Sequence, residues 1–382
     1  RAQNKLGLVT GVELSDIEKY KDKIDIETAH DIESDIKHDL MAEVKTYASQ
    51  AKIGGGKIHF GATSQDIEDN ADAIIFKSAV EIIETDLKAL LLTWAKQIEV
   101  NKNLVCMAYT HLQPAEPTTM GYRFAVYAQD LLLDLELLNF VKSQIKGKGT
   151  KGAVGNYASY FSLLGKKAEN LEEKVLEELG IAAFDVTSQV YPRKLDYLVL
   201  TLLSSIAQSL YKFAFDLRIL QSAPYGELME PFGQKQVGSS AMPFKRNPQN
   251  SERICSLARY ISSLTKVAWD NAANSLLERT LDDSASRRII IPDSFLATDE
   301  ILTQCKEIVE GLVINKNNIE KNLSLYGPFS ALESILLKST KGGADRQEMH
   351  ELLRSHSMKV YDDMAKTGKN NLFANLQRDQ KI

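Results

Sequence analysis

The apolar residues of this chain recur at steps of three and four positions, which is the spacing of one face of an α-helix. Residues 67–101 keep this pattern over the longest stretch and contain no glycine or proline. The same pattern predicts further long helices over residues 117–146, 194–222, 248–275 and 292–314. Proline stands at or near the start of several of them, which is a usual place for proline in a helix. Because the signals for strands are weak, the chain is predicted to be all-α.

These five predicted helices are longer than the average of about 10–14 residues in globular proteins. Their apolar faces are too broad for helices that cover a single surface, so they should pack together as a central bundle. The stretch 194–222 is apolar over most of its circumference. We therefore expect several copies of the chain to assemble around it, and a monomeric helical bundle is the alternative.

Shorter helices on both sides of the bundle divide the chain into three predicted helical domains. An N-terminal domain covers residues 1–63, a central long-helix domain covers 64–314, and a small C-terminal domain covers 315–382. The chain begins without methionine inside a predicted helix and ends without a clear stop. We therefore expect both outer domains to be incomplete.

The composition is that of an ordinary globular protein, with 44% hydrophobic and 25% charged residues. A net charge of −5 argues against a general nucleic-acid binder, which would normally be basic. It does not exclude an anionic ligand that is held by a few converging arginines. No apolar run reaches membrane-spanning length, and the start of the chain lacks a secretory signal. The three cysteines have no C-x-x-C spacing, which favours reduced thiols in a cytoplasmic protein over disulfides or a zinc site.

Three stretches match a ligand-binding motif only in form. "GKGTKG" at residues 147–152 has the G-x-G-x-x-G spacing, but it follows a helix instead of a strand, so we reject a dinucleotide site. "DIEDNAD" at 66–72 lacks the glycine and the closing glutamate of a calcium loop. His30 and His38 are eight positions apart on a predicted helix, about 80° apart in projection, and need not converge. No metal site is predicted.

Three polar segments carry groups that transfer protons or bind anions. "KHD", residues 37–39, lies in a predicted helix, where a histidine between charges is usually just solvated. "GATSQD", residues 61–66, opens the longest helix, where Thr and Ser either cap the helix or help to bind an anion. "THLQP", residues 110–114, places a histidine in a polar break between two helices. That histidine either caps a helix end or donates a proton near neutral pH.

A fourth segment joins "VGSSAMPFKRNPQNSER", residues 237–253, to "ERTLDDSASRR", residues 278–288. Its arginines could bind phosphate and carboxylates through forked hydrogen bonds. They are Arg253, Arg279, Arg287 and Arg288. The alternative is a surface salt-bridge network with Asp282 and Asp283. Each segment alone has a plain structural explanation, but together they combine proton-transfer groups with anion-binding groups on one helical scaffold.

The stretch "GSSAMPFKRNP", residues 238–248, resembles the signature loop of the fumarase/aspartase superfamily, G-S-S-x-M-P-x-K-x-N-P. Within that superfamily, "SSAMPFKRNPQNSERICSLAR" and "LERTLDDSASRR" are similar to the adenylosuccinate lyase family. "KHDLMAEV", "FGATSQDIEDNAD", "THLQPAEPTT" and "TSQVYPRKLD" resemble other segments of that family in the same order. The similarity runs over essentially the whole chain.

This resemblance implies a β-elimination without a cofactor that releases fumarate from a succinylamino nucleotide. The substrates would be adenylosuccinate, which gives AMP, and the succinylated carboxamide intermediate of purine synthesis (SAICAR), which gives AICAR. One group must remove a proton from the carbon beside a carboxylate, and another must protonate the leaving nitrogen. By the resemblance, Ser239 is the base and His111 is the acid.

The resemblance also implies the groups that support this pair. Lys245 would supply positive charge to the serine oxyanion and to the carboxylate that gains charge. Asn247 would donate a hydrogen bond to that carboxylate. Glu252 would be the partner of a catalytic histidine, and His38 would be a second histidine at the site. Lys37 stands where we expect arginine, which keeps the charge and loses the bidentate fork.

The family binds its nucleotide through many further side chains. The positions of this chain that match such residues are Lys37, Asp39, Thr63, Ser64, Thr110, Gln189, Asn247, Arg253, Arg279, Ser284 and Arg288. By the resemblance, each active site is built from three chains of a homotetramer whose core is made of the long helices. The resemblance implies no cofactor, metal, nucleic acid or membrane partner.

Two other readings stay open at this point. Argininosuccinate lyase and the fumarases share the signature loop, although the arginine-rich stretch 278–288 favours a nucleotide substrate. A non-catalytic scaffold with this fold would need neither Ser239 nor His111, and their joint presence argues against it.

Overall fold

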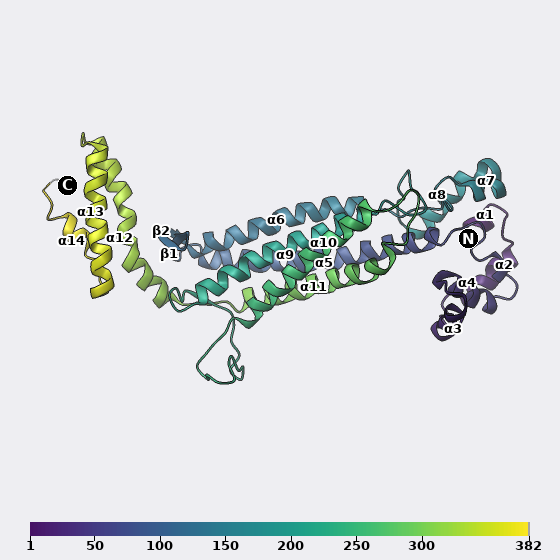
Figure 1. The fold of residues 1–382 in the computed structure, drawn as a ribbon, viewed down its shortest axis with the longest axis horizontal. Helices are drawn as coiled ribbons and strands as arrows, with labels where there is room; N and C mark the ends of the chain where they lie inside the picture. The colour runs from purple at the N-terminus through teal and green to yellow at the C-terminus, as the bar shows by residue number, and fades with distance from the viewer. Residues whose placement is uncertain (381–382) are drawn as a thin grey trace. The chain divides into compact units, whose positions relative to one another are not determined.

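The computed structural model describes residues 1–380, and most of them are α-helical (Figure 1). They form two compact units, each made of three separate stretches of the chain. Unit 1 consists of residues 1–84, 136–204 and 261–296. Unit 2 consists of residues 85–135, 205–260 and those from 297 onward. The predicted division into domains 1–63, 64–314 and 315–382 stays a prediction.

Five long helices contribute residues to both units, as the apolar pattern predicts (Figure 1). They are α5 (Gln65–Asn101), α6 (Met120–Gln144), α9 (Lys194–Gln221), α10 (Gln249–Ala273) and α11 (Ser284–Glu310). Their buried faces are apolar. In unit 2, for example, the ring of Trp94 packs against Phe124, Tyr127 and Phe213 with centroids 4.8–5.7 Å apart. The prediction of an all-α fold is confirmed.

A β-hairpin precedes α6, where the sequence predicted only a polar break between helices. Strand β1 (Val105–Thr110) pairs antiparallel with β2 (Gln113–Thr119). Pro117 therefore lies in β2, and α6 begins at Met120 instead of at this proline. Proline is tolerated in an edge strand, where not every amide needs a partner. The two prolines of β2 hid the strand signal, and the predicted start of this helix was wrong.

Helix α11 also begins earlier than predicted, at Ser284, and continues through Pro292. Proline inside a helix removes one backbone hydrogen bond and usually bends or ends the helix. Here Phe295, one turn later, packs on Phe76 of α5 with ring centroids 6.2 Å apart, and Ser294 is fully buried. We infer that packing outweighs the local preference of the proline.

Unit 1 also contains shorter helices, some of which are capped by a side chain. They are α1 (Ala2–Lys5), α2 (Gly11–Tyr20), α3 (Ile26–Ile36), α4 (Asp39–Gln50), η1 (Gly55–Lys57), α7 (Ala158–Leu164), η2 (Gly165–Lys167) and α8 (Ala168–Leu179). Thr10 and Glu13 form a capping box on α2, and Asp25 caps α3. These caps fix short helices whose own propensity would be marginal.

Unit 2 ends in three helices with a small apolar core of their own (Figure 1). They are α12 (Lys316–Lys341), α13 (Arg346–Thr367) and α14 (Leu372–Leu376). Leu353, Val360 and Leu372 are buried at its centre. The two-residue strands β3 (Leu228–Met229) and β4 (Val313–Ile314) pair just before α12.

Helix α9 is the one helix among residues 1–380 that is long and apolar enough, by length and composition alone, to cross a membrane. Its most apolar stretch is 56% buried inside the chain. Because the core helix of a soluble protein passes the same test, this is weak evidence for a membrane span.

Candidate active site

The residues predicted for the active site are divided between the two units. Unit 1 holds Lys37, His38, Asp39, Thr63, Ser64, Gln189, Arg279, Ser284 and Arg288. Unit 2 holds Thr110, His111, Ser239, Lys245, Asn247, Glu252 and Arg253. Among the described residues, no hydrogen bond or ion pair joins any two of the four proposed catalytic groups of unit 2.

His111 lies at the tip of the β1–β2 hairpin. The strands end with Thr110 opposite Gln113, so His111 and Leu112 form a two-residue turn. Both turn residues have positive φ, 53° and 61°, as in the type I′ turns that match the twist of the flanking strands. All four residues are exposed. The hairpin thus presents the imidazole to solvent, where a substrate can reach it.

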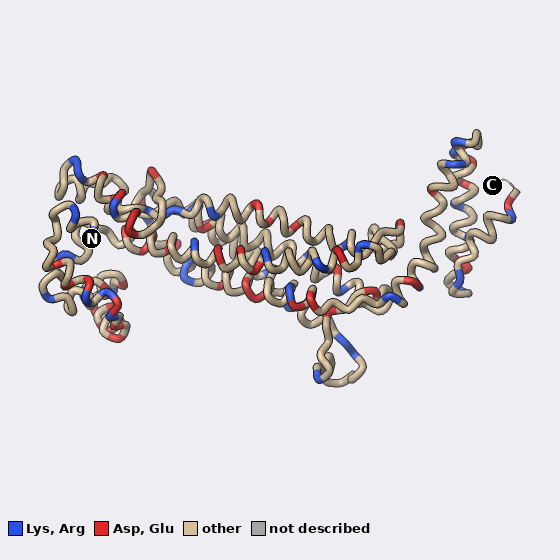
Figure 2. The backbone as a smooth tube through the Cα atoms, turned by 180° about the vertical axis from the view of Figure 1, so that it is seen from behind, with Lys and Arg blue, Asp and Glu red and all other residues tan. Residues whose placement is uncertain are grey.

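The signature loop leaves the helices after β3 and returns at α10 (Figure 1). The charged residues between positions 231 and 248 are Lys235, Lys245 and Arg246, all of them cations (Figure 2). A loop with positive charge and no carboxylate of its own attracts anions. This charge pattern suits a substrate that carries carboxylates or phosphate.

Hydrogen bonds close this loop on itself beside the proposed base. The carbonyl oxygen of Gly238 accepts from Asn247 Nδ2 at 2.9 Å and from Gln249 Nε2 at 3.3 Å. The Oγ of Ser239 accepts from the backbone amide of Met242 at 3.1 Å. Asn247, predicted to bind a substrate carboxylate, therefore holds the residue just before Ser239. A donor to the serine oxygen also stabilises negative charge on it.

A buried carboxylate anchors the far end of the loop, and the sequence analysis missed it. Glu230 accepts hydrogen bonds from the backbone amides of Asn250 and Ser251 at 3.2 and 3.0 Å, and from Ser251 Oγ at 2.9 Å. It acts as an N-terminal cap on α10 that comes from a distant residue. Glu252 and Arg253 follow in the first turn of α10. By holding this turn, Glu230 fixes the backbone from which their side chains extend. The one signal in the sequence is an acidic residue directly before the loop.

Three predicted site residues at this end of unit 2 are exposed. They are Lys245, Glu252 and Arg253. Arg253 lies 3.9 Å from Glu300 of α11, with both side chains more than half exposed. Exposed pairs of this kind contribute little to stability, so the arginine is free to bind another anion.

The "KHD" segment connects two helices rather than lying inside one. Lys37 ends α3 with a left-handed φ of 54°, and His38 caps α4 through Nδ1, which accepts from the amide of Met41 at 3.4 Å. The carboxylate of Asp39 forms an ion pair with Arg288 of α11 at 2.6 Å. Although partial burial acts against it, the hydrogen bond from Arg288 lowers the pKa of Asp39. The structure thus brings two predicted substrate-binding residues together.

Thr63 and Ser64 lie just before α5, as predicted, next to a buried ion pair. The amide of Thr63 donates to the carboxylate of Asp66 at 3.1 Å. Asp66 also accepts from the ammonium of Lys148, and both side chains are closed to solvent. Burial lowers the pKa of Lys148, while Asp66 acts in the opposite direction. The "GKGTKG" stretch that contains Lys148 therefore supports the start of α5.

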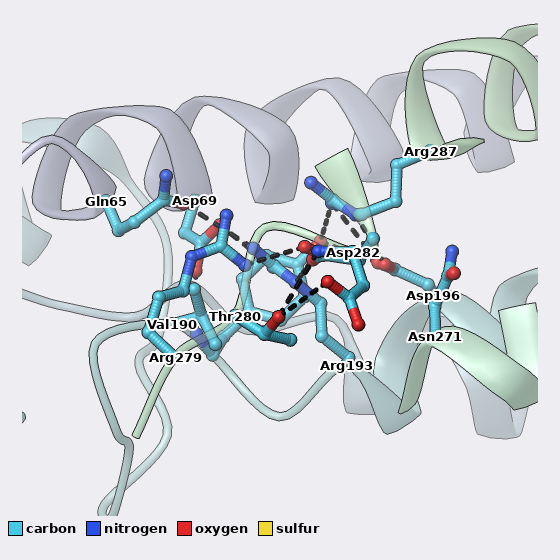
Figure 3. A network of polar contacts seen from close by, with 12 residues as sticks. Gln65, Asp69, Val190, Arg193, Asp196, Asn271, Arg279, Thr280, Asp282 and Arg287 are labelled. Carbon is cyan, nitrogen blue, oxygen red and sulfur yellow. Dashed lines mark hydrogen bonds and ion pairs between the residues drawn. The ribbon is translucent and has the colours of Figure 1, made fainter. Parts of the chain in front are cut away.

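A second buried network of charges joins α5, the segment before α9 and the start of α11 (Figure 3). Arg193 is at its centre, with Nη1 2.9 Å from Asp69 and Nε 2.6 Å from Asp283. Arg279, a predicted substrate-binding residue, also pairs with Asp283 at 2.7 Å. Burial raises the pKa of Asp69, whereas the two arginines outweigh burial at Asp283 and lower its pKa. Arg193 was not selected from the sequence, although it lies in the resembling stretch "TSQVYPRKLD".

Arg287 lies in the same region and forms ion pairs there (Figure 3). Its Nε lies 2.7 Å from Asp196, and its Nη2 lies 2.8 Å from Asp72 and 2.7 Å from the hydroxyl of Tyr191. This arginine therefore forms salt bridges, although not the surface network with Asp282 and Asp283 that was the alternative. Its partners are carboxylates of α9 and α5 instead of the neighbouring ones that the sequence suggested.

The remaining predicted residues of unit 1 lie around the start of α11. The amide of Gln189 donates to the carbonyl oxygen of Glu278 at 3.2 Å, which places Gln189 beside the backbone next to Arg279. Ser284 is the first residue of α11, and Arg288 follows one turn later.

Among residues 1–380, no group of three or more His, Cys, Asp or Glu side chains could hold a metal ion. Cys106, Cys255 and Cys305 are free and buried, and burial raises the pKa of each thiol. Their thiols are therefore poorly reactive at neutral pH.

Comparison with solved structures defines the class of this fold. Fumarate lyase from Mesorhizobium sp. BNC1 superposes with a TM-score of 0.85 at 21% identity, over 99% of this chain and 83% of that chain. The 3-carboxy-cis,cis-muconate lactonizing enzyme from Pseudomonas putida superposes with a TM-score of 0.82 at 24% identity, over 95% of this chain and 81% of that chain. The chain therefore has the helical fold of these enzymes, and its residues 1–262 match a family described as Lyase.

The relatives in sequence are more specific. Adenylosuccinate lyase of Schistosoma mansoni is 42% identical, over 99% of this chain and 80% of that protein. The adenylosuccinate lyase of Saccharomyces cerevisiae is 39% identical, over 99% of this chain and 80% of that protein. The adenylosuccinate lyase of Archaeoglobus fulgidus is 34% identical, over 100% of this chain and 83% of that protein. The chain belongs to the adenylosuccinate lyase family of lyases.

Proposed function

We propose that this chain cleaves adenylosuccinate to AMP and fumarate, and SAICAR to AICAR and fumarate, in purine nucleotide biosynthesis. The observation that carries the proposal is identity of 42% with an adenylosuccinate lyase over 99% of the chain. This relationship favours the nucleotide substrate over argininosuccinate or malate, and it favours an enzyme over a non-catalytic scaffold.

The reaction needs two proton transfers and no other reagent. Ser239, as the base, removes a proton from the succinyl carbon beside a carboxylate. The electrons of that C–H bond first move onto the adjacent carboxylate, which gives a carbanion-like intermediate, and they then form the double bond of fumarate as the bond to nitrogen breaks. His111, as the acid, then protonates the leaving nitrogen of the product. Charge appears on the substrate carboxylate in the intermediate, and Lys245 stabilises it.

The environment of the signature loop supports this assignment. A free serine hydroxyl is a very poor base and must be activated by its surroundings. The amide of Met242 already donates to Ser239 Oγ, and the loop adds cations without carboxylates. Both features favour the alkoxide form of the serine. Asn247 Nδ2 donates one of its two hydrogens to Gly238, and the second can donate to a substrate carboxylate.

We propose that the nucleotide is bound by the positions that match the family, among them Thr63, Gln189, Arg279 and Arg288. In the proposed assembly, a homotetramer, three chains contribute residues to each active site. Large apolar side chains that are exposed on the long helices of the single chain support an assembly that covers them. They include Ile75, Ile82, Leu92, Leu133, Phe140, Phe215 and Leu296. We place the enzyme in the cytoplasm, where its three free cysteines would stay reduced.

The test is to follow adenylosuccinate cleavage by ultraviolet absorbance in the wild type, Ser239→Ala, Ser240→Ala and His111→Ala. We expect AMP and fumarate from the wild type and a loss of at least ~100-fold for Ser239→Ala and His111→Ala. Ser240→Ala, the adjacent serine, should lose much less. A wild type that is folded and tetrameric but does not cleave adenylosuccinate contradicts the function. Full-rate cleavage by Ser239→Ala removes the base assignment and leaves the function in place.

A further inference from the structure

The turn that carries His111 needs support from outside the hairpin. His111 and Leu112 both have positive φ, a conformation that side chains with a Cβ adopt only at an energetic cost. Leu112 is none of the types that tolerate it best, which are glycine and, to a lesser degree, asparagine, aspartate and histidine. The strands below the turn are also irregular, since the register shifts between Met107 and Tyr109. A two-stranded hairpin alone is marginally stable, so its partners decide where the imidazole lies.

Tyr225 holds the hairpin through two direct contacts. The hydroxyl of Tyr225 donates to the carbonyl oxygen of Leu112, the residue after His111, at 2.8 Å. The ring of Tyr225 meets the ring of Tyr109 of β1 edge to face, with centroids 4.8 Å apart at 88°. One tether therefore acts on the turn itself and the other on the strand that leads into it.

Behind the tyrosines lies Glu227, whose side chain is fully closed to solvent. One carboxylate oxygen accepts from the hydroxyl of Tyr109 at 2.6 Å and from Asn322 Nδ2 of α12 at 3.0 Å. The other accepts from Arg123 Nη1 of α6 at 3.2 Å. Arg123 also donates to the carbonyl oxygen of Met107 in β1. This single carboxylate therefore links the hairpin to α6 and α12.

The backbone of Glu227 is held as firmly as its side chain. Its amide donates to the carbonyl oxygen of Leu220 at 3.0 Å, and its carbonyl oxygen accepts from the amide of Asn315 at 2.9 Å. A buried carboxylate is costly unless it is fully hydrogen-bonded, and here all its donors come from groups that contact or adjoin the hairpin. Stability alone would be served as well by apolar residues of the same volume.

We propose that Glu227, acting through Tyr109 and Tyr225, is a positioning residue that holds His111 in the geometry for protonating the leaving nitrogen. The inference rests on the proposed role of His111 as the acid. Proton transfer requires heavy atoms about 2.6–3.2 Å apart, so a small rotation of the turn removes the acid from reach. Of the positions proposed to bind substrate, Thr110 alone lies in the hairpin, so substrate binding should be affected less than proton transfer.

The experiment compares three variants with one matched control. Tyr225→Phe removes the hydrogen bond to Leu112, and Tyr109→Phe removes a donor to Glu227. Glu227→Gln weakens the bonds by which this carboxylate links the hairpin to α6 and α12. Tyr127→Phe is the control, because its hydroxyl makes the same kind of bond to a carboxylate, 2.9 Å to Asp216, in the same unit. We expect the three variants to lower kcat about tenfold or more with KM changed less than about threefold, and the control to keep its kcat.

A double-mutant cycle with His111→Ala separates positioning from mere loss of structure. In the His111→Ala background, Tyr225→Phe and Glu227→Gln should reduce kcat no further, because no acid remains to be positioned. If the losses multiply, the residues act on stability and the positioning role is wrong while the proposed function stands. If His111→Ala itself keeps the full rate, the assignment of the acid fails and the positioning role fails with it. Tyr225→Phe is conservative at a partly exposed site, so the cycle does not depend on a variant that fails to fold.

Discussion

The guanidinium of Arg193 lies 2.9 Å from the carboxylate of Asp69, and both side chains are closed to solvent. The same arginine reaches Asp283 at 2.6 Å, so it joins two carboxylates that are more than 200 positions apart in the chain. Charges in such a place are tolerated only when each has a partner. Arg279 shares Asp283 with Arg193, so this buried pair also fixes a side chain that is proposed to bind substrate (Figure 3).

Replacing the buried arginine should destabilise the protein strongly. Arg193→Met leaves two buried carboxylates without their main partner, a change that typically costs about 3–5 kcal/mol. Thermal unfolding followed by circular dichroism should show a large drop of the midpoint. Arg354→Met is the control, since Arg354 pairs with Glu351 at an exposed site, and its midpoint should stay near that of the wild type. Equal midpoints for the two variants would contradict the role of Arg193.

The exposed pair of Arg288 and Asp39 should behave in the opposite way. Both side chains are more than a third exposed, so Arg288→Met should change the free energy of unfolding by about 1 kcal/mol or less. If Arg288 binds the nucleotide, its loss should raise KM about tenfold or more with a smaller effect on kcat. Steady-state kinetics and thermal unfolding on the same preparation test both statements. An unchanged KM would exclude Arg288 from substrate binding.

The signature loop should not tolerate a side chain at Gly238. A Cβ there would overlap the carbonyl oxygen of Lys245, so the loop could no longer close in the observed form. Because the loop is largely exposed, Gly238→Ala should reduce kcat about tenfold or more while the thermal midpoint changes little. Gly233→Ala in the same loop is the matched control, since the nearest atom to its added Cβ would be 3.7 Å away. Full activity of Gly238→Ala would show that this closed form is not needed.

A pair of carboxyl groups in unit 2 should make stability depend on pH. Partial burial and a hydrogen bond with Asp299 raise the pKa of Asp86. Because the folded protein favours the protonated form of Asp86, this carboxyl group stabilises the fold fully below the pKa of the unfolded chain, near 4. That stabilisation is lost as pH rises through the pKa of the folded protein. Asp86→Asn should therefore raise the thermal midpoint at pH 8 relative to the wild type and have less effect at pH 4.

A carboxylate with the opposite shift is the control for that measurement. The amide of Thr28 lowers the pKa of Asp25, which caps α3. Its contribution is present above the unfolded pKa and is lost as pH falls through the folded value. Asp25→Asn should thus lower the midpoint at pH 8. Shifts of the same sign for both variants would rule out this explanation of the Asp86 pair.

Much of the helical framework follows from the sequence because a helix repeats about every 3.6 residues, so its apolar face is visible in the spacing of nearby residues. Apolar positions three and four apart identify α5, α9 and α10 to within a few residues at each end. The candidate catalytic residues came from a different source, the resemblance of the loop around Ser239 to a known signature. Local pattern failed where tertiary contacts oppose it, as at Pro117 in a strand and Pro292 inside a helix.

The supporting residues could not be found from the sequence. Glu227 contacts Tyr109, which lies 118 positions earlier, and Arg193 contacts Asp69, which lies 124 positions earlier. Nothing in the local pattern around an acidic or basic residue tells whether it is solvated or buried. The sequence by itself determined most of the helices, because helix formation depends on neighbouring residues, and it indicated the kind of chemistry through the resemblance of its loop to a known signature. Only the tertiary structure decided which charges meet in the interior, because burial makes an ion pair necessary only after distant segments have packed.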